Sequence, residues 1–154
     1  MEITMKKQAY TVIAIVVLVT AAGLTSANGQ TSGNARLIAS VPFEFSVGNS
    51  TFPAGEYVVN CANPSSAARV LRITSKDGGR SVVIQATDTI GKLQDNARLV
   101  FHRYGDQYFL AQAWMAADNT GLAVRKSRGE KESERRLAAM KTKPETVAVN
   151  LKRR

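Results

Sequence analysis

The chain offers few side chains that could do covalent chemistry. It contains one cysteine, Cys61, and one histidine, His102, so a Cys61–His102 pair is the only thiol-based catalytic pair that the sequence allows. Such a pair needs thiol and imidazole in hydrogen-bond contact, with a third group orienting the imidazole. Nothing in the spacing of the two residues brings them together. We therefore expect Cys61 to be a buried structural residue and His102 to lie on a partly apolar sheet face.

Carboxylate and metal chemistry have equally little support. Glu44 alternates outward along an early strand, and aspartates in turns usually hydrogen-bond to their own backbone. Five aspartates fall in or beside predicted turns: Asp77, Asp88, Asp95, Asp106 and Asp118. A small secreted hydrolase would need two carboxylates assembled by folding, and it is the alternative function. Cysteine pairs, a second histidine and EF-hand spacing are all missing from the sequence, so it predicts no catalytic, cofactor-binding or metal-ligating residue.

Positive charge is concentrated at the end of the chain. The formal net charge is +9 at pH 7; residues 125–154 hold eleven basic and four acidic side chains, a net of +7, whereas residues 30–124 have a net of +1. A cationic segment attracts anionic lipid head groups, acidic polymers or nucleic acid without reading a sequence. The segment lacks the interleaved aromatic residues on which nucleic-acid bases stack. An anionic envelope surface or polymer is therefore the predicted partner, and a merely solvated tail is the alternative.

Residues 1–29 have the organisation of a secretory signal peptide. Two lysines precede an apolar run, Ala9 to Leu24, which gives way to small and polar residues. Cleavage after Ala27 or Gly29 would leave a mature protein in the periplasm or outside the cell. An uncleaved N-terminal anchor is the alternative, but a membrane-spanning helix needs about 20 apolar residues. The run is shorter than that, so cleavage and export are predicted.

The body of the chain alternates like a series of short strands. From Arg36 to Val47 apolar residues occupy every second position, which is typical of a strand with one buried face. Pro42 within this run indicates an edge strand or a bend. Further strands are predicted over residues 56–61, 69–75 and 80–87, with the turn segments GNSTFPAG, NPSSA and KDGG between them. Regular short strands favour an antiparallel sandwich or barrel of six or seven strands.

Residues 97–115 predict a hairpin whose two-residue loop is Gly105-Asp106. The expected pairs on the core face are Arg103–Tyr108, Phe101–Leu110, Leu99–Gln112 and Ala97–Trp114. Those on the opposite face are Val100–Ala111, His102–Phe109 and Tyr104–Gln107. The opposite face also carries aromatic residues, so the tail or a partner is expected to cover it. The predicted core of the protein consists of Phe43, Phe45, Tyr57, Val59, Phe101, Leu110 and Trp114.

The last part of the chain predicts a helix and one more strand. Ser127 and Glu130 fit a capping box, the order of acidic and basic residues suits the helix dipole, and Pro144 is expected to end the helix. Leu137 and Met140 supply little apolar surface, so the helix is expected to be solvated and weakly docked. Alternating apolar residues after Pro144 permit a final short strand. The predicted organisation is a signal peptide at 1–29, a β-domain at 30–124 and a basic, partly helical tail at 125–154.

Two stretches of the chain carry a recognisable combination of motifs. They are SVPFEFSVGNSTFPAGEYVV and ARLVFHRYGDQYFLAQAW. Together they resemble a family of small uncharacterised secreted bacterial β-proteins with the patterns x-P-F-x-F-x-V-G, P-A-G-E-Y and L-x-F-x-x-Y-G-x-x-Y-F-L. The resemblance spans residues 37–136 and implies secretion, a β-fold and a charged C-terminal helix, with no activity or functional residue. The predicted function is a non-enzymatic exported β-domain acting as an envelope or extracellular binding or structural module.

Overall fold

Ten β-strands and one α-helix make up the part of the chain that the computed structural model describes, residues 36–63, 66 and 68–153. The predicted signal peptide, residues 1–29, lies outside these residues. All described residues belong to one compact unit. The strands are β1 (Leu37–Val41), β2 (Phe45–Val47), β3 (Ser50–Phe52), β4 (Gly55–Cys61), β5 (Arg69–Ser75), β6 (Ser81–Ile90), β7 (Arg98–Tyr104), β8 (Gln107–Trp114), β9 (Thr120–Val124) and β10 (Glu145–Arg153), and the helix is α2 (Arg128–Ala139).

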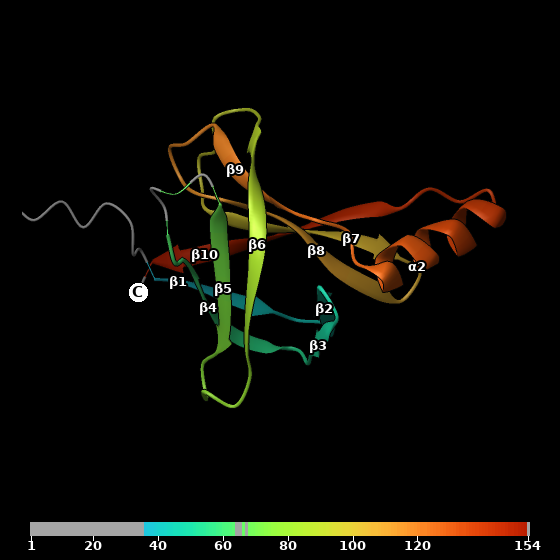
Figure 1. Cartoon of the computed structure of the whole chain (residues 1–154), viewed down its shortest axis with the longest axis horizontal. Helices are drawn as coiled ribbons and strands as arrows, with labels where there is room; N and C mark the ends of the chain where they lie inside the picture. The colour runs from blue at the N-terminus through green and yellow to red at the C-terminus, as the bar shows by residue number, and fades with distance from the viewer. Residues whose placement is uncertain (1–35, 64–65, 67, 154) are drawn as a thin grey trace, which may run out of the picture. The chain divides into compact units, whose positions relative to one another are not determined.

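Eight of the strands close into an antiparallel barrel. Their order is β8-β7-β10-β1-β4-β5-β6-β9, and β9 pairs again with β8 to complete the ring. In Figure 1, β5 and β6 stand nearly upright while β7 and β10 run across them. The predicted mainly antiparallel β-fold is confirmed, and of the two predicted architectures the barrel is the one found. The described residues contain ten strands and not the predicted six or seven, because the first predicted strand is divided, the turn GNSTFPAG contains β3, and β9 was not predicted.

Pro42 divides the first predicted strand in two. β1 is a central strand between β10 and β4, so Pro42 marks a bend and not an edge. Its ring removes the backbone donor that a continuing ladder would need. Beyond the bend β2 pairs antiparallel with β3, and Ser46 pairs in parallel with Phe109 of β8. The β2–β3 hairpin is therefore added to the barrel beside β8.

An aromatic cluster fills the centre of the barrel. The ring of Phe45 lies 5.1 Å from that of Tyr57 and 5.3 Å from that of Phe101, both edge to face. Six of the seven predicted core residues are buried, whereas Phe43 is partly exposed and stacks on Tyr108. Cys61 is buried in the same interior cluster, as predicted. The alternation of apolar residues therefore identified the inward face of the N-terminal strands.

A β-bulge changes the face on which Trp114 lies. The predicted hairpin register holds from the turn back to Phe101–Leu110, but Ala111 is then an extra residue on β8. Three predicted pairs are consequently wrong, since Gln112 faces Val100, Ala113 faces Leu99 and Trp114 faces Arg98. One inserted residue moves every later side chain to the other face of a strand. Ala113 thus joins the interior cluster, while Trp114 is buried outside it.

The C-terminal residues complete the barrel. Ser127 caps α2, its Oγ accepting the backbone N–H of Glu130 at 3.1 Å. The helix ends at Ala139, and Lys141 adopts a left-handed conformation with φ of 58°, so the chain has left the helix before Pro144. β10 then pairs with β7 on one side and β1 on the other. The predicted final short strand is therefore a nine-residue central strand.

Candidate functional site

The helix α2 covers the outer face of β7 and β8. The buried residues of β7 and β8 that lie outside the interior cluster are Val100, Tyr104, Phe109, Ala111 and Trp114, of which Trp114 packs against Gly91 and Gly121. Figure 1 shows α2 beside these two strands, and Gly129 of α2 approaches the Phe109 ring. Of the two predicted covers for the second aromatic face, the tail is the one observed, over the part of the face around Tyr104 and Phe109.

Polar side chains attach α2 to the sheet, while most of the helix is exposed to solvent, as predicted. Glu130 and Ser133 are the buried residues of α2, with 3% and 6% of their surface exposed. Glu130 Oε1 lies 2.8 Å from His102 Nδ1 and accepts the Tyr104 hydroxyl at 3.2 Å. Ser133 donates to Gln107 at 2.5 Å. The sequence analysis did not foresee these hydrogen bonds, which hold the helix where apolar surface is scarce.

The Glu130 carboxylate is shared between an imidazole and a phenol. Burial of Tyr104, followed by the charge of Glu130, raises the pKa of the Tyr104 phenol above its ordinary value. The neutral phenol is thus held as a donor to the carboxylate. Because Glu130 is almost fully buried, no substrate reaches its carboxylate while α2 stays docked. Glu130 and Ser133, with their partners His102, Tyr104 and Gln107, therefore join the helix to the sheet, and we call these residues the clamp.

Cys61 and His102 do not form a pair, as expected from their spacing. Cys61 lies in the interior cluster at the end of β4, whereas His102 faces α2 on the outside of β7. The barrel wall separates the thiol from the imidazole. His102 instead takes Glu130 as its partner, consistent with its prediction as a structural histidine on a partly apolar face.

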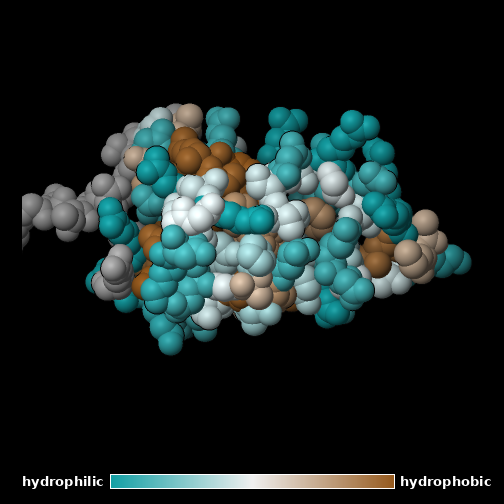
Figure 2. Space-filling view, turned by 90° about the horizontal axis from the view of Figure 1, so that it is seen from below, coloured by the Kyte–Doolittle hydropathy of each residue, from teal (hydrophilic) through white to brown (hydrophobic). Residues whose placement is uncertain are grey.

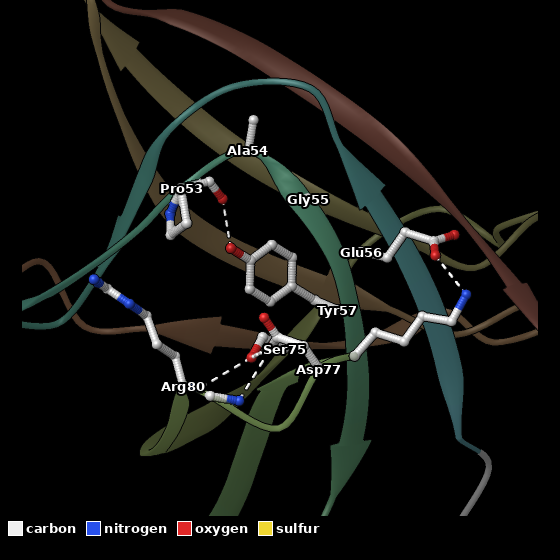
Figure 3. Close-up of a pocket in the computed structure, with 10 residues that line it drawn as sticks. Pro53, Ala54, Gly55, Glu56, Tyr57, Ser75, Asp77 and Arg80 are labelled. Carbon is white, nitrogen blue, oxygen red and sulfur yellow. Dashed lines mark hydrogen bonds and ion pairs between the residues drawn. The ribbon is translucent and has the colours of Figure 1, made fainter.

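A cleft of about 580 Å³ lies at one end of the barrel, between residues 53–57 and 75–80. Figure 3 shows that the carboxylates of Glu56 and Asp77 are engaged with protein groups. Glu56 pairs with Lys76, Asp77 accepts from the Ser75 hydroxyl and the Gly79 N–H, and Arg80 donates to the Thr51 carbonyl at 2.7 Å. The Ser75 hydrogen bond lowers the pKa of Asp77. A general acid needs a raised pKa instead.

The remaining predicted carboxylates are dispersed. Asp88 pairs with Arg69 at 3.1 Å, and Asp118 accepts the Thr120 N–H at 2.8 Å. Asp95 lines a second cleft near the start of β7, while Glu44 and Asp106 are exposed. Within the described residues, no group of three His, Cys, Asp or Glu side chains is arranged to hold a metal ion. Of Glu44, Asp88, Asp95, Asp106 and Asp118, Asp95 is the one that lines either of these clefts.

The acidic side chains of residues 125–154 all have partners. Besides the buried Glu130, Glu132 pairs with Arg136 at 3.3 Å, Glu134 with Lys126 at 2.6 Å, and Glu145 with Arg103 at 3.1 Å. The basic residues here that are exposed and form no ion pair with any described residue are Arg125, Arg128, Lys131, Arg135, Lys141, Lys143, Lys152 and Arg153. The tail therefore presents uncompensated positive charge.

Three of these cations line one side of α2. Arg128, Lys131 and Arg135 follow one another at helical spacings of three and four residues, opposite the buried Glu130 and Ser133. We call these three residues the α2 cationic stripe. The clamp holds Glu130 and Ser133 against the sheet and so fixes the rotation of the helix about its axis. The stripe on the opposite side therefore faces solvent.

Comparison with known proteins assigns no family to the chain. No family model matches it, and neither does any curated protein or solved structure. In the part of the chain that the structure describes, no helix has the length and apolar character needed to cross a membrane.

Proposed function

We propose that the protein is a non-enzymatic, exported β-module that binds an anionic envelope surface or polymer through the α2 cationic stripe and the neighbouring tail cations. The observation that carries the proposal is the pairing of every acidic side chain in residues 125–154. The exposed cations there lack acidic neighbours within ion-pair distance among the described residues. Positive charge arranged in this way attracts polyanions over a Debye length.

The docking of α2 makes the stripe a preorganised surface. A flexible cationic tail loses conformational entropy when it binds, which weakens its affinity. Here Glu130 and Ser133 anchor α2 to β7 and β8. After the helix, the chain is fixed again by β10, which pairs with β7 and β1 in the barrel wall. Arg128, Lys131 and Arg135 are therefore presented from a fixed helix, which favours a binding role over that of a solvated tail.

A small secreted hydrolase is the competing function, and the cleft of Figure 3 would be its site. Such an enzyme needs one carboxylate kept protonated beside a second that stays ionised. Glu56 and Asp77 line the cleft, yet Lys76 neutralises the first and the Ser75 hydroxyl stabilises the charged form of the second. The arrangement supports a structural turn more than acid–base chemistry.

Two matched charge variants test the proposal on the full chain. In Lys131→Gln/Arg135→Gln two cations of the stripe are removed, and in Arg36→Gln/Arg72→Gln two exposed cations outside residues 125–154 are removed. Each cation near an anionic surface contributes about 1 kcal/mol, so the stripe variant should bind immobilised dextran sulfate about 30-fold more weakly at low salt. The control variant should stay close to the unchanged protein.

Elution from dextran sulfate in a salt gradient measures the difference. The stripe variant is expected to elute at lower salt than both the unchanged chain and the control variant. Equal displacement of the two variants would show that net charge alone governs binding. That result, or binding insensitive to salt, would contradict the proposed role of the stripe.

A further inference from the structure

Two large apolar side chains are exposed where β6 ends and the loop to β7 begins. The face of the molecule in Figure 2 is mostly hydrophilic, and large apolar residues that stay exposed are few among the described residues. Ile90 and Leu93 are two of them, with 83% and 69% of their surface exposed. They lie three residues apart, on either side of Gly91 and Lys92. We call Ile90 and Leu93 the apolar tip.

The loop that carries the tip is fixed to its surroundings. Gly91 N–H donates to the Asn119 carbonyl at 2.8 Å, and Gln94 exchanges backbone hydrogen bonds with residues 117 and 118 at 2.8 and 3.1 Å. Gly91 also lies against the Trp114 ring, where an added Cβ would come within 2.5 Å of the indole. The exposure of the tip is therefore built into the fold.

The turn that receives these hydrogen bonds is strained. Ala117 has a φ of 58°, a conformation that costs free energy for a residue with a side chain. Its N–H donates to the Gln94 carbonyl, so the strained residue helps to hold the tip loop in place. Backbone strain of this kind is often found at binding sites.

A polar cleft of about 310 Å³ lies directly beside the tip. It is lined by residues 92–96 together with Arg98 and Asn150. Two of these residues, Lys92 and Arg98, are cationic, and one, Asp95, is acidic. Arg98 Nε is buried and has no hydrogen-bond partner among the described residues. Exposed Lys152 and Arg153 follow Asn150 on β10 and add positive charge at this end of the barrel.

We infer that the apolar tip and the adjoining cationic cleft form a contact site for an anionic lipid bilayer. Ile90 and Leu93 enter the boundary between head groups and acyl chains, while Lys92 and Arg98 bind the phosphates of the head groups. Apolar side chains beside lysine and arginine are the combination that interfacial membrane contacts use. The positive charge of the cleft complements the anionic surface.

The small size of the tip favours a bilayer over a protein partner. A stable protein interface buries about 800 Å² on each side, more than two aliphatic side chains supply. A bilayer requires no matching shape, so even two inserted side chains contribute to binding. The inference goes beyond the proposed function, since the tip lies at the end of β6 and the stripe lies on α2, and Figure 1 shows these two elements apart. A failure of polyanion binding by the stripe would leave it standing.

Trp114 is a built-in reporter for this contact. It is the single tryptophan of the chain and lies against Gly91, beneath the tip. The full chain would be mixed with vesicles of phosphatidylglycerol whose acyl chains carry bromine, which quenches tryptophan at short range. Bound protein is expected to show quenched Trp114 fluorescence. Because the apolar run at residues 9–24 is present in every variant, differences between variants report on the substituted positions.

Two double variants make the comparison specific. Ile90→Ser/Leu93→Ser removes the tip, while Val83→Ser/Met140→Ser removes two other exposed apolar side chains. The tip variant should need about tenfold more lipid, or more, to reach half of the quenching of the unchanged chain. The control variant should quench as the unchanged chain does. All four positions are exposed, so thermal melting is expected to stay unchanged and to verify folding.

Three outcomes would overturn the inference. The first is an unquenched Trp114 in vesicle-bound protein, and the second is quenching that the tip variant leaves intact. The third is a dimer in sedimentation that Ile90→Ser/Leu93→Ser abolishes, which would assign the tip to a second copy of the chain. Weaker quenching by phosphatidylcholine than by phosphatidylglycerol would support the role of Lys92 and Arg98 in binding anionic head groups. Equal quenching by the two lipids would overturn that role.

Discussion

Deleting residues 143–154 is expected to unfold the barrel. β10 pairs with β7 along residues 145–150 and with β1 along residues 151–153. Its removal opens the barrel between two central strands and exposes the interior cluster to water. The loss should exceed the 5–15 kcal/mol that stabilises a typical domain. Circular dichroism should then show no cooperative thermal transition.

The matched control for the deletion keeps the strand and removes only its terminal charge. Lys152→Gln/Arg153→Gln changes two exposed side chains and should shift stability by no more than about 0.5 kcal/mol. A truncated chain that still melts cooperatively within a few degrees of the intact protein would contradict the structural role of β10. Because the deletion is expected to unfold the protein, charge substitutions and not truncations are suitable for measuring the binding role of residues 125–154.

Phe101→Ala is expected to destabilise the protein by about 3–5 kcal/mol, the usual cost of emptying a buried phenylalanine site. Phe101 is fully buried, and its ring contacts Phe43 and Phe45 edge to face, each at 5.3 Å between ring centroids. Urea unfolding measures the loss as a lower midpoint at unchanged slope.

Phe43→Ala provides the comparison for Phe101→Ala. Phe43 also stacks on Tyr108 but is partly exposed, so its truncation leaves a cavity that solvent and neighbours fill more easily. We expect a clearly smaller loss of stability than for Phe101. Equal losses for the two variants would show that the centre of the core lies elsewhere than around Phe101.

The strands that were predicted well are those in which alternation is undisturbed. β5 has the predicted bounds of residues 69–75, and the apolar positions from Leu37 to Val47 face inward on both sides of Pro42. In such strands the alternation of apolar residues is sufficient to predict the buried face, because successive side chains point to opposite faces of the sheet. The face of Trp114 was predicted wrongly because the extra residue Ala111 leaves no mark in the composition.

The clamp under α2 depends on contacts that the sequence does not encode locally. The pattern Ser127 to Glu130 predicted the cap, and Ser127 forms it. In a capping box the glutamate returns to the backbone of the cap residue, whereas the carboxylate of Glu130 reaches His102 and Tyr104 on β7. These contacts depend on how α2 docks on β7, since Glu130 is 28 residues from His102 and 26 residues from Tyr104 in the sequence. The aromatic residues on the second face of β7 and β8 were the one sequence signal that another part of the chain or a partner covers this face.

The pairing of β10 was likewise beyond local reasoning. Alternating Val147, Val149 and Leu151 predicted a strand but not its neighbours. Closure of the barrel requires β10 to lie between β7 and β1, the first strand in the sequence. Such long-range pairing is fixed by the whole set of strands and not by one segment.

Amide-resolved NMR of the full chain, titrated with soluble dextran sulfate, would locate the polyanion site. The α2 cationic stripe predicts that chemical shifts change first at residues 128–139 and 141–143, and that the changes reverse as salt is added. The Lys131→Gln/Arg135→Gln variant should weaken them, and the Arg36→Gln/Arg72→Gln variant should not. Changes confined to the cleft between residues 53–57 and 75–80, or no changes at any residue, would contradict a binding function for the stripe.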